Sequence, residues 1–483
     1  MHWNFHQTYT QLPTALFSRV VPATVPQPKL GIINHALALD MGLDPELLSS
    51  PSGIAELAGC KVPPGADPIA QAYAGHQFGS FTMLGDGRAI VLGEHVDPSG
   101  GRRDVQLKGS GLTPYSRSGD GKAALGPMLR EYVISEAMHA MGIPTTRSLA
   151  VVTTGERVYR ETPLAGAVLT RIALSHIRVG TFQYAAALQD PVLLKTLADY
   201  TINRHFPELS DSRIPYTALL EGVMRRQIAL MTAWMNVGFI HGVMNTDNMA
   251  ISGETIDYGP CAFMDRYDPA TVFSSIDRYG RYAFGNQPAI VLWNLSRFAE
   301  TLLPLVNNDR ANAVEQAKAI LSSFEQDFND QWSHALRKKL GLFNTEDGDR
   351  DLAETLLEWM KLNRRDYVNT FRSLMDGMDA PAGIFIQHPS LLDWWKSWEE
   401  RRKRQSPSSE ESLRMMQRAT PAIIPRNHHV EMALRAASVE NDFQPLKRLI
   451  DALQAPYSHE RLRETYQDPA PVDALPYYTF CGT

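Results

Sequence analysis

Two short segments in the middle of the chain combine side chains that could bind a metal ion and move a proton. The first is His241-Gly242-Val243-Met244-Asn245-Thr246-Asp247-Asn248, and the second, nine residues after Asn248, begins Asp257-Tyr258-Gly259. Mg²⁺ prefers oxygen ligands and commonly takes one or two protein side chains together with nucleotide phosphates. Asn248 and Asp257 would provide such a pair, so the spacing predicts a metal and nucleotide site here.

The first segment has the spacing of a protein-kinase catalytic loop, H-R-D-x-x-x-x-N, with one part missing. In kinases the Asp accepts the proton of the substrate hydroxyl and the Asn holds Mg²⁺. Asn248 is in register, but the position of the base is Val243, which cannot accept a proton. Such a scaffold either is inactive or does different chemistry. Asp247 could replace the base; a capping or salt-bridging role for it is the alternative.

A lysine at the end of a strand-like segment, Asp104 to Lys108, could hold the nucleotide. In kinases such a lysine contacts phosphates and pairs with an acid on the following helix. Here a helix is predicted from Pro127 to Gly142, with proline at its start and glycine at its end. It offers Glu131 and Glu136, and its apolar periodicity does not decide which of them is the partner.

Two glycine-flanked turns could approach phosphate through backbone amides: Gly85-Asp86-Gly87-Arg88 and Ser118-Gly119-Asp120-Gly121-Lys122. Neither is a P-loop, since G-x-x-x-x-G-K-[ST] occurs nowhere in the chain, and each is also typical of a plain hairpin turn. Arg171 and Arg178 could fork onto phosphate oxygens, with two surface arginines as the alternative.

The composition excludes several classes of protein. The 483 residues carry a net charge of −6, which argues against a general nucleic-acid binder. Three cysteines without metal-type spacing indicate a reducing compartment. No apolar stretch approaches the roughly 18 to 20 residues of a membrane span, and the N-terminus resembles no targeting signal. We therefore expect a cytoplasmic protein with no membrane or nucleic-acid partner.

The elements around these residues predict an α+β fold with two lobes. Residues 1–180 are predicted to form a small kinase-like lobe together with an N-terminal extension. The lobe has glycine-rich strands, including Ala89 to Leu92 and Leu149 to Thr153, and one helix, and the extension has a helical stretch near Leu30 to Leu48. Residues 181–483 predict a helical lobe that carries the two loops and a C-terminal extension. Its helices are predicted at Pro191 to Asn203, Thr217 to Gly238, Ala289 to Val306, Ala311 to Lys339 and Asp351 to Met375.

Taken in order, these residues closely resemble the selenoprotein O family of YdiU-type pseudokinase nucleotidyltransferases. The resemblance spans essentially the whole chain. It includes Asn4-Phe5, Tyr73-Ala74-Gly75-His76-Gln77-Phe78-Gly79, Gln106-Leu107-Lys108-Gly109-Ser110-Gly111, the segment from Gly242 to Asp257 and the cysteine-containing tail. The family has a kinase-like fold that binds ATP in a flipped orientation, so it transfers AMP to protein hydroxyls.

The resemblance implies a role for each motif residue. Asp247 would be the proton acceptor, Asn248 and Asp257 would hold Mg²⁺ or Mn²⁺, and Lys108 would pair with Glu131. The residues implied to hold the nucleotide are Gly85, Gly87, Arg88, Lys108, Asp120, Gly121, Arg171, Arg178 and Asp257.

The implied reaction is AMP transfer from ATP to Ser, Thr or Tyr side chains of target proteins, with release of pyrophosphate. UMP transfer from UTP with Mn²⁺ is also associated with the family, and the sequence does not decide between the donors. An inactive nucleotide-binding scaffold and a conventional phosphotransferase remain the alternatives.

The family also implies a redox role for its C-terminal tail. Some bacterial relatives pair a C-terminal cysteine with one in the activation segment. Cys481 is therefore a candidate redox residue. The segment from Met264 to Arg281 contains no cysteine and Cys261 is the nearest candidate, so the sequence argues against such a disulfide here.

Overall fold

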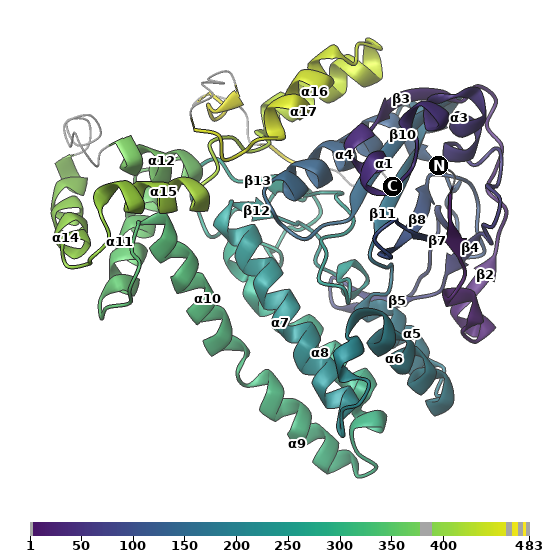
Figure 1. Ribbon diagram of the computed structural model, residues 1–483, viewed down its shortest axis with the longest axis horizontal. Coiled ribbons are helices and arrows are strands. Elements are labelled where there is room, and N and C mark those ends of the chain that lie inside the picture. Colours follow the sequence, from purple (N-terminus) through teal and green to yellow (C-terminus); the bar gives the residue numbers. More distant parts are fainter. Residues whose placement is uncertain (1–2, 377–388, 460–465, 472–476, 480–483) are drawn as a thin grey trace.

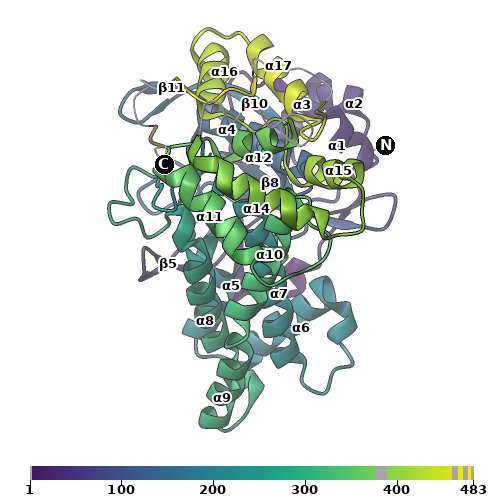
Figure 2. The same ribbon diagram turned by 90° about the vertical axis from the view of Figure 1, so that its left-hand side faces the viewer.

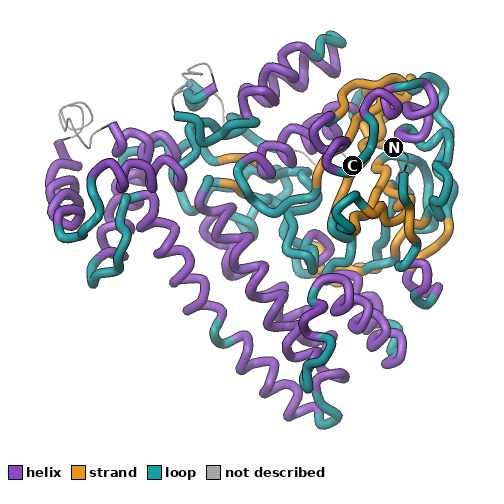
Figure 3. The backbone as a smooth tube through the Cα atoms, in the orientation of Figure 1, coloured by secondary structure: helices purple, strands orange, loops and turns teal. Residues whose placement is uncertain are grey.

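The computed structural model describes residues 3–376, 389–459, 466–471 and 477–479. Strands gather in the N-terminal half and helices make up most of the C-terminal half (Figure 3). The predicted α+β class is confirmed, and the arrangement is consistent with a kinase-like fold. The boundary between lobes at residue 180 stays a prediction, although every strand of the main sheet described here ends before it.

The main sheet has nine strands within the described residues, in the order β2-β4-β7-β8-β11-β10-β3, with β1 paired to β7 and β9 to β11. All of these pairings are antiparallel. The strands are β1 (Phe5–His6), β2 (Phe17–Arg19), β3 (Lys29–Ile33), β4 (Ile69–Gln71), β7 (Ala89–Val96), β8 (Arg102–Lys108), β9 (Ala123–Ala124), β10 (Arg147–Tyr159) and β11 (Pro163–Ala173).

The two faces of this sheet have different roles because successive side chains of a strand point to opposite faces. Val105 and Leu107 of β8 lie in a hydrophobic cluster with residues of the short helices α1 (His35–Asp40), α2 (Pro45–Ser49) and α3 (Pro51–Leu57). Gln106 and Lys108 alternate with them and face the opposite way. Arg171 of β11 stands directly opposite Gln106 in the register. The sheet thus brings two polar strand ends to one face.

The helix α4 (Leu125–Ala140) lies on this polar face and is buried on nearly every side. It contacts β10 and β11, and its other side packs against α16 (Asn427–Val439) and α17 (Gln444–Leu453) (Figure 1). A helix buried all round has no single apolar stripe. This is why periodicity could not rank the two glutamates that α4 carries.

The helical half carries the remaining elements, and Figure 2 shows its outer helices from the front. Two small hairpins join it: β5 (Ala74–Gln77) with β6 (Ser80–Met83), and β12 (Phe239–Ile240) with β13 (Ala262–Phe263). The helices are α5 (Val179–Ala187), α6 (Pro191–His205), α7 (Pro215–Asn236), α8 (Gln287–Val306), α9 (Arg310–Leu321), α10 (Phe324–Lys339), α11 (Asp349–Leu362), α12 (Tyr367–Asp376), α14 (Leu392–Lys403) and α15 (Ser409–Ala419).

Three predicted helices have other boundaries. The stretch near Leu30 to Leu48 begins as strand β3, because residues 29–33 pair with β10, and only then forms α1 and α2. The stretch Ala311 to Lys339 is two helices. It breaks at Ser322 and Ser323, whose hydroxyls donate to nearby backbone carbonyls and compete with the helical ladder. The stretch Asp351 to Met375 is likewise divided into α11 and α12.

One helix corrects the expectation that no segment is long and apolar enough to cross a membrane. Residues Phe284–Val306 meet that criterion, with a mean hydropathy of 1.3. In the fold, however, α8 packs against α5, α7 and α9, and its side chains Leu295, Phe298 and Leu302 are fully buried. Its apolar composition therefore serves protein packing.

Candidate active site

The hairpin of β12 and β13 closes the loop that carries the two opening segments. Phe239 pairs with Phe263, so the residues between them return to their starting point. His241 is buried and holds the loop from inside: its Nε2 lies 2.9 Å from the carbonyl oxygen of Ile256, and its ring packs against Trp234. The histidine of the motif therefore has a structural role.

The proton acceptor and the amide ligand predicted from the sequence lie on one short 3-10 turn, Thr246–Asn248. The Asn248 side chain donates from Nδ2 to the carbonyl oxygen of Val243 at 3.0 Å, which fixes its orientation and leaves its Oδ1 as an oxygen ligand. Val243 itself is buried. The position of a kinase base is thus filled by an apolar side chain that packs.

Asp257 is the meeting point of three cations from separate elements. Its Oδ1 accepts from Lys108 Nζ at 2.7 Å and from an Arg171 nitrogen at 2.6 Å. Its Oδ2 lies 3.4 Å from Arg178 Nη1. The backbone of Asp257 is left-handed, with φ of +64°, a conformation that asparagine and aspartate tolerate better than most residues. The turn directs the carboxylate toward the sheet.

Glu131 is the acid that pairs with Lys108. The two side chains are 2.7 Å apart, and Glu131 also accepts from Arg171 at 2.8 Å. Glu136 instead pairs with Arg147 at the start of β10. Both acids on α4 are therefore engaged, but only Glu131 faces the cations around Asp257.

The electrostatics of the two aspartates differ. Burial alone would raise the pKa of Asp257, but Lys108, Arg171 and Arg178 outweigh it and hold this pKa well below its usual value. Burial raises the pKa of Asp247 to about 6, although Arg178 opposes the shift. Asp247 Oδ1 has no hydrogen-bond partner among the described residues. Asp257 is thus a fixed anion, whereas burial makes the Asp247 carboxylate bind a proton more readily.

Arg178 is held by residues whose part in the site the sequence did not reveal. Its guanidinium lies over the Tyr73 ring, 4.5 Å from the centroid, and 3.7 Å from a carboxylate oxygen of Asp86. Its Nη1 also donates to the backbone oxygen of Asp247 at 3.0 Å. Gln106 similarly accepts from Arg171 at 3.2 Å. No local pattern predicts such contacts, because the partners are far apart along the chain.

The β5–β6 hairpin covers Asp247. A Cβ atom on Gly75 would lie 2.1 Å from Asp247 Oδ1, so only glycine allows this approach without a shift. Gln77, two residues on and on the same face, acts through its side chain to lower the pKa of Asp247. The hairpin therefore shields the carboxylate from solvent on one side.

The first predicted glycine turn, residues 85–88, packs against the segment of residues 113–116, which precedes the second turn. Thr113 Oγ1 donates to the Asp86 carbonyl at 2.6 Å, and Ser116 Oγ donates to the Gly87 carbonyl at 2.5 Å. Gly85 has a φ of +143°, and a Cβ there would meet the Tyr115 ring at 2.3 Å. The backbone at Gly85 thus lies so close to Tyr115 that only glycine fits at this position.

The other members of this predicted set lie in different surroundings. Asp120 is partly exposed and forms an ion pair with Arg160 at 2.9 Å, while Gly121 packs its backbone on Gly111. Arg88 lines a cavity of about 490 Å³ together with Lys108, Glu131 and Gly259. The cavity is closed on its far side by α16 and by Tyr477 to Thr479. It is the candidate space for part of a nucleotide.

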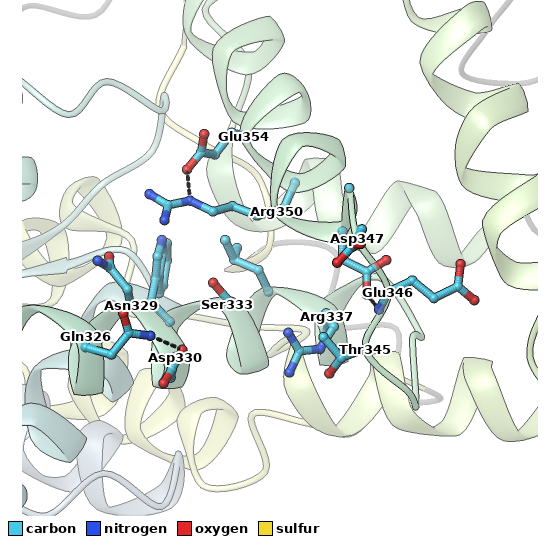
Figure 4. Close-up of a pocket in the computed structure, with 15 residues that line it drawn as sticks. Gln326, Asn329, Asp330, Ser333, Arg337, Thr345, Glu346, Asp347, Arg350 and Glu354 are labelled. Carbon is cyan, nitrogen blue, oxygen red and sulfur yellow. Dashed lines mark hydrogen bonds and ion pairs between the residues drawn. The ribbon is translucent and has the colours of Figure 1, made fainter.

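A second cavity, of about 320 Å³, is remote from these residues (Figure 4). Side chains of α10 and α11 and of the connecting loop line it, including Asp330, Arg337 and Glu354. It contains none of the residues predicted to act on a nucleotide. Among its charged side chains, Arg350 pairs with Glu354, while Glu346 and Asp349 pair with Arg401 outside the cavity.

The donor set at Asn248 and Asp257 fits a hard divalent cation. It consists of the amide oxygen of Asn248, whose Nδ2 donates to the Val243 carbonyl, and the carboxylate of Asp257. Across the described residues, no group of three or more His, Cys, Asp or Glu side chains forms a ready metal cage. A cation here would therefore need phosphate oxygens to complete its coordination, as Mg²⁺ usually does.

The two cysteines among the described residues, Cys60 and Cys261, are free thiols. Cys261 is buried, its pKa is raised to about 11 by burial, and its carbonyl oxygen accepts from Arg130. Cys60 is partly buried. Cys481, the predicted redox residue, lies outside the described residues.

With this geometry in place, comparison with known proteins identifies the family. The sequence model of the family described as protein adenylyltransferase SelO matches residues 1–454. The chain belongs to this family. The predicted selenoprotein O resemblance is thus confirmed over nearly the whole chain.

Similar proteins of this family come from several bacteria, and each carries the name protein nucleotidyltransferase YdiU. The protein of Bacillus cytotoxicus is 56% identical over 481 residues, covering 100% of this chain and 98% of the relative. Those of Brevibacillus brevis and Halalkalibacterium halodurans are each 57% identical, with the same coverage of both chains. The SelO family match and these relatives together make the chain a nucleotidyltransferase by descent.

Proposed function

We propose that this protein transfers AMP from ATP to Ser, Thr or Tyr hydroxyls of other proteins and releases pyrophosphate. One observation carries the proposal: Lys108, Arg171 and Arg178 converge on Asp257, and the nearby Asp247 has a carboxylate oxygen without a hydrogen-bond partner among the described residues. Three clustered cations suit a triphosphate, and a free carboxylate suits an incoming hydroxyl. Membership of the SelO family supports the same assignment.

The three cations would hold the nucleotide. Without phosphate, their nearest anions are Asp257 and Glu131. A triphosphate would add negative charge to a buried region already rich in donors, where electrostatic attraction is stronger than in water. Arg88, which lines the adjoining cavity, would add a further contact. The contacts predicted for Gly85, Gly87, Asp120 and Gly121 stay predictions.

Asn248 and Asp257 would hold Mg²⁺ or Mn²⁺. When bound, such an ion neutralises phosphate charge at the reacting phosphorus and orients the leaving group. The protein supplies the two oxygen ligands on adjoining loops, and the nucleotide supplies the rest.

Asp247 would accept the proton of the attacking hydroxyl on its carboxylate. The hydroxyl oxygen then forms a bond to the α-phosphorus while the bond from this phosphorus to the bridging oxygen breaks. The bridging oxygen keeps the electron pair and leaves as part of pyrophosphate. Alignment of attacking and leaving oxygens and charge neutralisation supply the rate enhancement. Val243 takes no part, since it is apolar and buried.

The donor nucleotide and the cell compartment stay predictions. UTP is the second candidate donor, as the family resemblance implies. A cytoplasmic location and the lack of a nucleic-acid partner rest on composition alone.

The test separates the reactions by isotope. Incubation of the protein with ATP labelled at the α-phosphate, Mg²⁺ and acceptor proteins should label protein, and Asp247→Asn should lower the rate about 10²- to 10⁴-fold. Label arriving only from the γ-phosphate would indicate a phosphotransferase instead. Nucleotide binding without any label would indicate a scaffold. Intact-mass measurement with ATP or UTP would identify the donor.

A further inference from the structure

The β5–β6 hairpin has two different faces. Gly75 and Gln77 point to Asp247, as described above. The alternating positions face the other way: His76 stands opposite Phe81 in the register, and their rings are 5.3 Å apart. Met83 lies on the same side as Phe81. The hairpin therefore turns its polar face to the catalytic loop and an apolar face outward.

The hairpin is anchored directly to the catalytic loop. The backbone nitrogen of His76 donates to Thr246 Oγ1 at 2.7 Å, and that of Phe78 donates to Asn245 Oδ1 at 3.1 Å. Asn245 and Thr246 immediately precede Asp247. The tip of the hairpin is thus fixed within two residues of the proposed proton acceptor.

A second segment, residues 274–282, is anchored to the same asparagine. Tyr282 donates from its hydroxyl to Asn245 Oδ1 at 2.5 Å, and its ring lies 5.1 Å from that of Phe78. Asp277 accepts from the backbone nitrogens of Arg281 and Tyr282, which folds the segment into a compact turn. The hairpin and this turn therefore form one continuous surface beside Asp247.

This surface exposes large apolar side chains. Phe81 is 48% exposed, Met83 46%, Ile276 56% and Tyr279 99%. Single exposed apolar residues are ordinary, but a group of them beside a catalytic residue is typical of an interaction site. We call Phe78, Phe81, Met83, Ile276, Arg278 and Tyr279 the acceptor surface.

The charges of the acceptor surface are positive. Arg278 is exposed and has no hydrogen bond or ion pair with a described residue. The Arg281 guanidinium lies 4.8 Å from the Trp293 ring centroid beneath the hairpin tip and pairs with no described carboxylate. The nearest acid in the segment, Asp277, is buried and bonded to backbone nitrogens. An incoming anion would thus meet cations without competition from this turn.

We propose that the acceptor surface binds the protein substrate, at a segment that carries an apolar side chain and an acidic side chain close to the accepting hydroxyl. The inference rests on the proposed function and names the substrate chemistry of that site. The apolar side chain would pack on Phe81 and Met83, and the acidic one would pair with Arg278. Asn245 links both parts to the loop of Asp247, so a segment bound here would lie next to the catalytic loop.

A defined peptide set tests the proposal. Each peptide carries one Ser, Thr or Tyr, flanked by acidic, basic or apolar residues, and is offered with α-labelled ATP to the full-length protein. We expect peptides with both an acidic and an apolar neighbour to be labelled about tenfold better than their basic counterparts. Equal labelling of all flanking classes would overturn the proposal.

Variants of the acceptor surface test whether its side chains cause the preference for acidic and apolar peptide residues. Arg278→Glu should abolish the acidic preference and favour basic peptides, whereas Arg213→Glu, an exposed arginine without a described partner before α7, should leave it unchanged. The double variant Phe81→Ser and Met83→Ser should raise the peptide KM about tenfold or more and leave the KM for ATP unchanged. Val192→Ser and Leu362→Ser, each at a side chain 73% exposed, are the matched controls.

The outcomes separate the two proposals. If the wild-type protein labels no peptide or protein from any nucleotide, the proposed function fails. If it labels peptides and the surface variants match their controls, only the acceptor surface is wrong. Loss of ATP binding in the double variant would show damage to the fold of the hairpin and would count against the surface as a separate binding element.

Discussion

Two buried lysines in different regions show how this fold treats charge. Lys108, in the sheet beside Asp257, lies 2.7 Å from each of two carboxylates. Lys339, at the end of α10 in the helical half, is fully buried and its Nζ has no hydrogen-bond partner among the described residues. Its neighbours are the Tyr367 and Phe371 rings, with centroids at 5.3 and 4.6 Å. Burial lowers the pKa of Lys339 to about 7.

The difference shows that the buried charge of Lys108 is part of the proposed site, whereas the buried amine of Lys339 has no comparable role in the fold. At the site, opposite charges compensate each other's desolvation and leave a dense cluster suited to phosphate. At α10 the aromatic faces offer only cation–π attraction, so the lysine loses affinity for its proton. Each region can be perturbed alone to test this interpretation.

The largest effect is expected at the paired site. Glu131→Gln removes an acid between Lys108 and Arg171, and a buried pair broken on one side costs about 3–5 kcal/mol. Urea unfolding would measure the loss. ATP affinity should also fall about tenfold, because Lys108 is no longer held in place.

Glu136→Gln is the matched control for that experiment. It breaks the ion pair with Arg147 on the same helix and should also reduce stability. ATP affinity should stay near the wild-type value, because Glu136 faces away from the cations. Equal losses of ATP affinity in both variants would mean that the ion pair of Glu131 with Lys108 has no specific effect on ATP binding.

The unpaired lysine should behave in the opposite way. Lys339→Met keeps the volume and removes a buried amine without a partner, so we expect stabilisation of about 1–3 kcal/mol at pH 6. Lys338→Met, on the neighbouring residue, is the control and should change little. Destabilisation by Lys339→Met would show that the ring contacts outweigh the cost of burial.

The low pKa of Lys339 should also make the free energy of unfolding depend on pH. Between pH 7 and about 10.5, the ordinary lysine value, the unfolded chain keeps the Lys339 proton that the native state has lost. Native stability should therefore rise with pH in that window, by up to about 1.4 kcal/mol per unit. Below pH 7 both states are protonated and this contribution is constant. The difference between wild type and Lys339→Met, measured by urea unfolding at several pH values, isolates the effect from other groups.

The smallest effect is expected at Asp120. Its ion pair with Arg160 is partly exposed, and such pairs contribute about 0–1 kcal/mol. If this pairing is its main role, Asp120→Ala should change ATP affinity by less than about twofold. A larger loss of affinity, measured by isothermal titration, would support the nucleotide role predicted for Asp120 and would extend the charged site to this loop.

Local patterns predicted much of the fold. The strands at Ala89 to Leu92, Asp104 to Lys108 and Leu149 to Thr153, and the long helices of the helical half, have composition and periodicity that act over a few residues. The boundaries failed where tertiary contacts intervened, as at Leu30 to Ile33, which joined the sheet edge.

The sequence by itself determined which groups stand near each other along the chain. Asn248 and Asp257 on adjoining loops, Asp247 beside the amide, and Val243 in place of a base all follow from spacing. The pairing of Lys108 with Glu131, left open by periodicity and implied only by the family resemblance, is seen in the tertiary structure. Only that structure decided the other partners: Arg160 for Asp120, Tyr73 and Asp86 for Arg178, and, among the described residues, none for Lys339. The reason is physical. These contacts depend on strand register and on what buries each helix face, and neither is encoded in local periodicity.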